Sequence, residues 1–258
     1  MKIVVCIKQV PNTDTVKIDP KTNNLVRSNV EGIINSFDRN AIEAALQLKQ
    51  QAGGEVVLLS MGPESYISSL RDGLAMGADA AILLSSRKFG GADTLATGYT
   101  LAKAITKIGN VDLILFGRQS VDADTGQVGP IVAEDLQLPQ ITFAESVELQ
   151  NNNQLIGHRL LDSVVQEVKV QLPAVVTVRS EMNQPRYETP LNIQKSFEKE
   201  ITIWSENELA VDPTQIGQPG SPTIVKRIYS PDKAGRQTQM LPSDAKSAVS
   251  TLLSELNN

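Results

Sequence analysis

Apolar residues occur along the chain in short runs that alternate with longer stretches of helical spacing. Four β-branched runs have the length of strands: Lys2–Ile7, Glu55–Ser60, Ala81–Leu84 and Val111–Phe116. Each precedes a stretch with apolar residues every three or four positions: Asp38–Gln51, Glu64–Met76, Thr94–Ile108 and Gln127–Leu136. Because right-handed crossovers place each helix over the sheet, this alternation predicts an α/β fold with a doubly wound, mostly parallel, Rossmann-like sheet.

Glycine and turn residues mark the ends of these elements. Gly53-Gly54, Gly77 and Gly109 follow the first three predicted helices, where left-handed caps are common. Between the first strand and the first helix, Thr15–Asp19 and Asn24–Arg27 flank four turn residues. We therefore expect a β-hairpin there, covering one edge of the sheet.

The pattern changes in the second half of the chain. Strand-like runs follow one another without helices: Ala144–Leu149, Leu155–Leu161, Val164–Val170 and Ala174–Val178. They predict a β-hairpin extension that returns to the sheet. After Arg179 prolines become frequent, and Ala245–Leu256 is the single strong helical run. Such a tail buries little surface against itself, so we expect an arm that lies on another subunit.

Composition narrows the classes of function. The 24 basic and 29 acidic residues of the 258-residue chain give a net charge of −5 without long charged blocks, which argues against a nucleic-acid partner. The single cysteine, Cys6, rules out an intrachain disulfide and a cysteine-built metal cluster. The sequence has neither a secretion-signal pattern nor a long apolar run, so we expect a cytoplasmic protein without membrane insertion.

Ligands of doubly wound sheets bind beyond the carboxyl ends of the strands, so the loops after the strands are the candidate sites. The longest, Gly117–Pro130, contains three glycines and leads into a helix. Thr125–Gly129 is a candidate diphosphate cradle, with Thr125 as a helix cap. Spacing alone favours a turn residue and a cap for Asp122 and Asp124, because their charge opposes a phosphate. The pair lacks an obvious third carboxylate for a metal ion.

Two further loops contain polar residues at helix starts. In Asn35–Asp38, we expect Asp38 to cap the first helix and Asn35 to donate to a base or ribose. In the loop Phe89–Thr97, a pair of glycines precedes three polar residues that either contact a cofactor or cap the helix: Asp93, Thr94 and Thr97.

The common nucleotide and hydrolase motifs are absent. The sequence has no Gly-x-Gly-x-x-Gly after the first strand and no Gly-Lys-Ser/Thr phosphate loop. His158, the only histidine, has no catalytic motif around it and is expected at the surface. We expect Cys6 to be a packed side chain of a strand rather than a nucleophile. No side chain is therefore assigned a catalytic or metal-binding role.

Taken in order, five segments make the chain resemble the β subunit of electron-transfer flavoproteins along essentially its whole length. The segments are Val4–Lys8, Asn35–Asp38, Ser60–Pro63, Leu74–Asp79 and Asp112–Gln119. The family's signature is also similar to Gln166-Glu167-Val168 followed by Pro173–Thr177, with Arg159 and Asp162 upstream.

The resemblance implies that an adenine nucleotide is held largely by main-chain groups and hydroxyls, so that Asp122 and Asp124 need not face phosphate. The implied cofactor-binding residues are Cys6, Asn35, Ser36, Phe37, Asp38, Met61, Gly62, Asp93, Thr94, Thr97, Arg118, Ser120, Val121, Asp122, Ala123, Asp124, Thr125, Gly126, Gln127, Val128, Gly129 and Pro130. For Arg118 two interpretations have equal weight: it tunes a flavin electrostatically, or it is a surface arginine paired with a carboxylate.

The family has two forms, and the loops Phe89–Thr94 and Asp122–Pro130 resemble the bifurcating one. That form implies an FAD that accepts hydride from NADH. One electron goes to a low-potential acceptor such as ferredoxin, and the other passes through the FAD of the α subunit to an FAD-dependent dehydrogenase. The flavin supplies the chemistry, and no acid–base side chain is required.

The resemblance also divides the chain by partner. Residues 1–182 form the α/β nucleotide-binding domain, 183–200 a recognition loop for the dehydrogenase, and 201–258 an arm that packs on the α subunit. The implied partner-binding residues are Tyr187, Leu191 and Lys195. Two alternatives remain: a subunit that holds AMP in the same site, and a nucleotide-binding regulatory module without redox function.

Overall fold

The computed structural model describes residues 1–12, 17–18, 25–26, 31–150, 153–224, 238 and 240–256. The chain divides into two compact units, Met1–Ile224 and Val225–Asn258. Among the described residues of the second unit, helix α7 (Ala245–Leu256) is the regular element.

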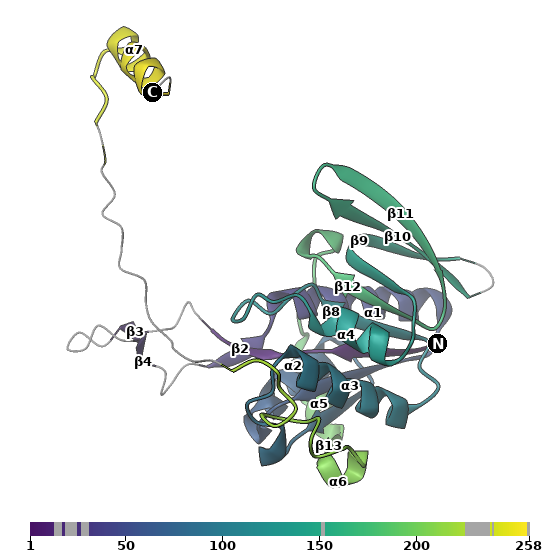
Figure 1. Ribbon diagram of the computed structural model, residues 1–258. Coiled ribbons are helices and arrows are strands. Elements are labelled where there is room, and N and C mark those ends of the chain that lie inside the picture. Colours follow the sequence, from purple (N-terminus) through teal and green to yellow (C-terminus); the bar gives the residue numbers. More distant parts are fainter. Residues whose placement is uncertain are drawn as a thin grey trace. The chain divides into compact units, whose positions relative to one another are not determined.

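A large sheet forms the centre of the first unit. Among the described residues, nine strands pair in the order β11-β10-β9-β12-β8-β1-β6-β7-β13 (Figure 1). Their bounds are β1 Lys2–Cys6, β6 Glu55–Met61, β7 Ala80–Leu84, β8 Leu113–Gly117, β9 Gln140–Gln150, β10 Gln154–Leu161, β11 Val164–Gln171, β12 Ala174–Val178 and β13 Ile201–Trp204. All neighbours from β9 to β13 are parallel, and β10 is antiparallel to β9 and β11.

Helices cover both faces of this sheet, which confirms the doubly wound α/β prediction. Because successive side chains of a strand point to opposite faces, β1 contributes Ile3 and Val5 to one core and Val4 and Cys6 to the other. Helices α1 (Ser36–Ala52) and α2 (Ile67–Met76) close the first core, and α3 (Thr94–Ile108) and α4 (Val128–Asp135) the second. Each fully buried Leu, Ile or Val in these cores stabilises the fold by roughly 1.5–3 kcal/mol.

The predicted helix ends agree with the structure. Gly53, Gly77 and Gly109 end α1, α2 and α3 with φ values of 70°, 129° and 67°, a region that side chains other than glycine rarely adopt. The first turn preceding α2 is a separate 3₁₀ helix, Glu64–Tyr66. Two more 3₁₀ helices are Arg87–Phe89 and Ser180–Met182.

Short antiparallel pairs connect β1 to α1. Strands β2 (Gln9–Pro11) and β5 (Gly32–Ile34) pair with each other, as do β3 (Lys17–Ile18) and β4 (Leu25–Val26). The second pair agrees with the predicted hairpin, whose turn residues lie outside the described part of the chain. Its covering of a sheet edge stays a prediction. The hairpin extension is confirmed, because β9, β10 and β11 continue the sheet and β12 returns between β9 and β8.

The residues from 183 to 224 pack on the central sheet and its helices more extensively than their proline content predicted. Helix α5 (Pro190–Glu198) packs against α2, and β13 pairs in parallel with β7. Leu209, at the end of α6 (Glu206–Leu209), and Ile216 are buried in the core beside α3 and α4. Residues 183–224 thus pack against the sheet and its helices, and the arm that lies on another subunit stays a prediction. The prolines start helices and turns here, as Pro190 does at the first position of α5.

Candidate functional site

The predicted loops meet where the winding of the sheet reverses. β1 lies between β8 and β6, and the chain runs from β1 through α1 to β6 over one face but returns through α3 to β8 over the other. The carboxyl ends of β1 and β8 are direct neighbours, with Cys6 opposite Phe116. This edge is the position at which doubly wound sheets bind nucleotides.

The start of α1 fastens the loop that follows β8. Asn35, the residue preceding the helix, donates through Nδ2 to the carbonyl oxygen of Gln119 (2.8 Å) and accepts through Oδ1 from the N–H of Val121 (3.1 Å). The side chain of Asn35 is buried, and both its amide nitrogen and its amide oxygen hold the loop. That Asn35 also donates to a base or ribose stays a prediction.

Asp38 is not the cap of α1, contrary to the sequence expectation. Asn35 occupies the capping position without a side-chain bond to the helix, and Asp38 lies one turn further on, buried. Its carboxylate accepts from the N–H of Lys8 (2.7 Å) and from the N–H of Gly117 (3.1 Å). Asp38 thereby ties the ends of β1 and β8 together.

Burial governs the titration of both acidic groups beside this junction. It raises the pKa of Asp38 to about 7, even though the hydrogen bonds from Lys8, Asn35 and Gly117 oppose the shift. Burial, with the charge of Asp38, also raises the pKa of the Cys6 thiol well above its usual value. Cys6 is thus a protonated, packed side chain, as the sequence predicted.

The remaining residues of the α1 start lie against the same junction. Ser36 and Phe37 open the helix. A Cβ on Gly117 would come within 2.7 Å of Phe37 and 2.2 Å of the Asp38 carboxylate, so only glycine permits this approach.

In the loop after β8, both aspartates have partners within the chain. The Nζ of Lys8 lies 2.7 Å and 2.9 Å from the two carboxylate oxygens of Asp122 and 3.4 Å from Oγ of Ser120. Asp124 accepts from the side-chain amide of Gln119 and stands in the left-handed region, with φ of 57°. The N–H groups of Ala123 and Asp124 donate to the carbonyl oxygen of Ser120, which closes a turn.

The lowered pKa of Asp122 agrees with its pairing to Lys8. Burial opposes the shift, but the hydrogen bonds from Lys8 and Ser120 and the charge of Lys8 outweigh it. Lys8 was absent from the predicted site residues. Its place directly after a buried strand was the available sequence signal.

The end of the loop forms the start of α4. Gln127, not Thr125, precedes the helix, and no side chain caps it, so the expected Thr125 cap is wrong. Gly126 has φ of 63°. The first N–H groups of a helix have no intrahelical acceptor, and here Val128 and Gly129 supply them while Pro130 cannot. A Cβ on Gly129 would lie 2.6 Å from Thr177 and 3.4 Å from Phe116, so this glycine serves packing.

The loop before α3 reaches the same edge. Asp93 caps α3 by accepting from the N–H groups of Leu95 (3.0 Å) and Ala96 (3.1 Å). Its other oxygen accepts from Thr223, so the carboxylate is fully used. Thr94 donates to Gln127 (2.9 Å) and thereby links α3 to the loop before α4. Thr97 stands in the first turn of α3, half-buried.

At the end of β6, Met61 is packed against the core and Gly62 lies under an aromatic ring. A Cβ on Gly62 would come 2.5 Å from the Tyr66 ring. Burial, followed by the charge of Asp122, raises the pKa of Tyr66, which places this ring close to the loop after β8. The sequence analysis did not identify Tyr66, because a tyrosine in a strand-to-helix turn has no distinctive spacing.

Arg118 points toward the β9 side of the edge. Its guanidinium lies 5.3 Å from the centre of the Phe143 ring, and Nε donates to Gln119 (2.9 Å). Within the described part of the chain, no carboxylate forms an ion pair with Arg118. The described residues thus supply no carboxylate partner, and both interpretations of Arg118 stay predictions. Phe143 has φ of 56°, an uncommon backbone conformation for a bulky residue.

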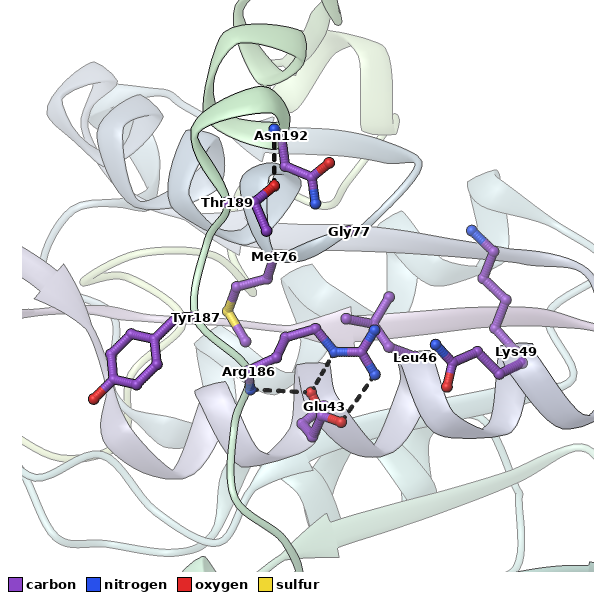
Figure 2. A pocket seen from close by; sticks show the side chains of 10 residues that line it. Glu43, Leu46, Lys49, Met76, Gly77, Arg186, Tyr187, Thr189 and Asn192 are labelled. Carbon is purple, nitrogen blue, oxygen red and sulfur yellow. Dashed lines mark hydrogen bonds and ion pairs between the residues drawn. The ribbon is translucent and has the colours of Figure 1, made fainter.

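The predicted partner-binding residues occupy a separate surface. Tyr187 is 87% exposed and Leu191 58%, and Lys195 is also exposed on α5. Arg186 lies beside a cavity of about 570 Å³ between α1, the end of α2 and residues 186–192 (Figure 2). This cavity involves none of the nucleotide-site residues.

The geometry fits a nucleotide held mainly by main-chain groups. Residues 121–125 form an exposed loop, and this loop leads into α4, whose first N–H groups have no intrahelical acceptor. Among the described residues, no three histidine, cysteine, aspartate or glutamate side chains gather as potential metal ligands. His158 lies partly exposed on the extension, hydrogen-bonded to Ser146 and Glu167. No described helix combines the length and apolar character needed to cross a membrane.

Comparison with known proteins agrees with this geometry. The electron transfer flavoprotein domain matches residues 22–209. The chain is 42% identical to the caffeyl-CoA reductase-Etf complex subunit CarD of Acetobacterium woodii, covering 99% of this chain and 98% of CarD. It is 43% identical to the electron transfer flavoprotein subunit beta of Clostridium acetobutylicum, with the same coverage. Protein FixA of Azorhizobium caulinodans is 40% identical, covering 99% and 94%. The chain therefore belongs to the electron transfer flavoprotein family.

Proposed function

We propose that the chain is the β-type subunit of a bifurcating electron-transfer flavoprotein and works in a cytoplasmic heterodimer with an α-type subunit. The observation behind this proposal is the anchored loop 117–130 at the junction of β1 and β8, in a chain closely similar to CarD. The name of CarD places that relative in a complex with a caffeyl-CoA reductase.

In this proposal the chain binds and positions FAD. The free N–H groups of Val128 and Gly129 would bind phosphate oxygens, and the hydroxyls of Ser120 and Thr125 lie on the same loop. Asn35 and Asp38 would hold the loop rather than the ligand, since their polar atoms are engaged within the chain. Bound here, FAD would supply the redox chemistry, taking hydride from NADH and passing electrons singly to ferredoxin and to the FAD of the α subunit.

Two further surfaces would serve the partners. The exposed residues Tyr187, Leu191 and Lys195 would contact an FAD-dependent dehydrogenase. Helix α7 exposes Val249, Leu252, Leu253 and Leu256, whose spacing forms one apolar stripe. We assign this stripe to the α subunit, as the arm.

The deciding experiment is to purify the chain with its α-type partner and measure FAD and AMP released per heterodimer. Two FAD and no AMP would support the bifurcating form. One FAD with one AMP would instead indicate the form in which the β-subunit site holds AMP. Absence of both nucleotides would contradict the proposed site.

A further inference from the structure

Lys8, two residues after the end of β1, contacts both the start of α1 and the anchored loop. Its N–H donates to Asp38 (2.7 Å), and its carbonyl oxygen accepts from the N–H of Asn35 (2.9 Å). Its ammonium group contacts Asp122 and Ser120. The backbone of Lys8 is thus fixed by the start of α1, and its side chain is free to act on the loop alone.

The contact between Lys8 and Asp122 changes the net charge of the loop more than it changes the free energy of unfolding. The side chain of Lys8 is 40% exposed and that of Asp122 33% exposed, and partly exposed ion pairs contribute little to folding. Asp122, however, lies in the loop that leads to the free N–H groups of α4. An uncompensated carboxylate there would repel a phosphate.

We propose that Lys8 is a positioning residue of the nucleotide site: by neutralising and holding Asp122, it allows this loop to accept the phosphate groups of an adenine nucleotide. The inference rests on the proposed function, because it requires a nucleotide at this edge. It gives Asp122 a physical explanation within the chain, because its negative charge is balanced by Lys8, which lies between β1 and β2.

The test uses the complex with the α-type partner, stripped of nucleotide and titrated with AMP and with FAD. In Lys8→Met the charge of Asp122 is uncompensated, so we expect both dissociation constants to rise about tenfold or more. In the double variant Lys8→Met with Asp122→Asn the repulsion is gone, and we expect affinity to return close to that of the native complex.

Lys2→Met is the matched control. Lys2 lies at the other end of β1 and forms a similar ion pair with Glu55 (3.2 Å), remote from the nucleotide site. Its replacement should leave both dissociation constants unchanged. Thermal unfolding of all variants should stay close to the native midpoint, because these pairs are partly exposed.

Each other result has a separate meaning. A native complex that binds neither AMP nor FAD would refute the proposed function itself. Native affinity in Lys8→Met would overturn the role of Lys8 while leaving the site intact. Equal loss in Lys8→Met and in the double variant would also overturn it, since that result indicates direct contact between Lys8 and the phosphate.

Discussion

Asp38 combines full burial with two hydrogen bonds from backbone N–H groups. Burial raises its pKa from 3.8 to about 7, so the folded chain holds a proton that the unfolded chain releases across this interval. The contribution of Asp38 to the free energy of unfolding is therefore complete below about pH 4 and is lost as the pH rises through about 7.

Replacing Asp38 by asparagine tests whether the native protein loses stability as the pH rises. Asp38→Asn leaves one backbone N–H without its acceptor, which costs roughly 1–3 kcal/mol at any pH. Because the asparagine does not ionise, we expect the variant to lose less stability relative to the native complex at about pH 8 than at about pH 5. Thermal midpoints at both pH values provide the measurement. A difference that is the same at both would contradict the raised pKa.

Gly126 offers a second test at the scale of one residue. Its φ of 63° disfavours any residue other than glycine, and an added Cβ would lie 3.4 Å from the carbonyl oxygen of Arg118. We expect Gly126→Ala to strain the loop by about 1 kcal/mol and lower FAD retention after dialysis several-fold. Gly109→Ala, at a similar φ of 67° but at the end of α3, should retain FAD normally. Equal retention in both variants would argue against the loop as the binding element.

Gly129→Val, in contrast, would not test ligand binding by this loop in isolation. A valine there would meet Thr177 and Phe116, so it would disturb the packing of α4 on the sheet whether or not a ligand is near. Sequence alone could place Gly129 at the start of a helix. It could not reveal the strand neighbours, which lie far away in the chain.

The same limit explains the misassigned cap role of Asp38 and the unforeseen partners of Asn35. The spacing correctly located both residues at the start of α1. Their partners Gly117 and Val121 are 79 and 86 residues away, and only the pairing of β1 with β8 brings them together. Local propensity favours a cap for an aspartate in this position, and tertiary contacts overrode it.

At the scale of elements, α1 connects the nucleotide site to residues 183–189. Two residues after Asp38, Asn40 exchanges hydrogen bonds with Asn183. Glu43, buried with 6% of its side chain exposed, accepts from Nε (2.7 Å) and Nη2 (2.9 Å) of Arg186. Figure 2 shows this pair beside the cavity, with the ring of Tyr187 pointing away from the pair. Because the cavity separates residues 186–189 from part of α1 and α2, apolar packing does not fully hold these residues, and polar contacts fix their position.

Glu43→Gln should loosen this stretch selectively. The variant keeps the shape of the side chain but loses the charge-assisted pair, so we expect amide hydrogen exchange in residues 184–189 to accelerate several-fold. Glu55→Gln, which removes an exposed pair with Lys2, should leave their exchange unchanged. Mass spectrometry of the complex gives the comparison. Unchanged exchange in Glu43→Gln would mean that Thr189, the cap of α5, suffices to hold the stretch.

Acid should weaken the same contact. Burial opposes the shift, yet the hydrogen bonds from Arg186 and Gln47 and the charge of Arg186 lower the pKa of Glu43 below 4.5. The stabilisation is therefore present above the unfolded pKa and is lost as the pH falls through the lower, folded value. Faster exchange of residues 184–189 on acidification, after correction for intrinsic rates, would follow.

At the scale of the molecule, periodicity predicted the sheet core and the main helices because those elements bury continuous apolar faces. The strand β13 escaped prediction because it is short and pairs at the edge of the sheet, with Ile203 partly exposed. Helix α5 escaped because its apolar residues are exposed rather than buried, so no core periodicity marks it. Exposure of this kind points to a partner, which the sequence of one chain cannot supply.

Helix α7 presents the same situation in the second unit. Its apolar stripe is exposed among the described residues, and a helix of 12 residues is marginal in water unless that stripe is covered. We therefore expect Leu253→Ser to weaken association with the α-type subunit at least several-fold, measured by sedimentation of the two purified subunits. Ser254→Asn, on the opposite face, should have no effect. Because α7 belongs to a separate unit, the nucleotide site should retain its affinity in complexes formed at high concentration. Unaltered association in Leu253→Ser would exclude this stripe as the contact.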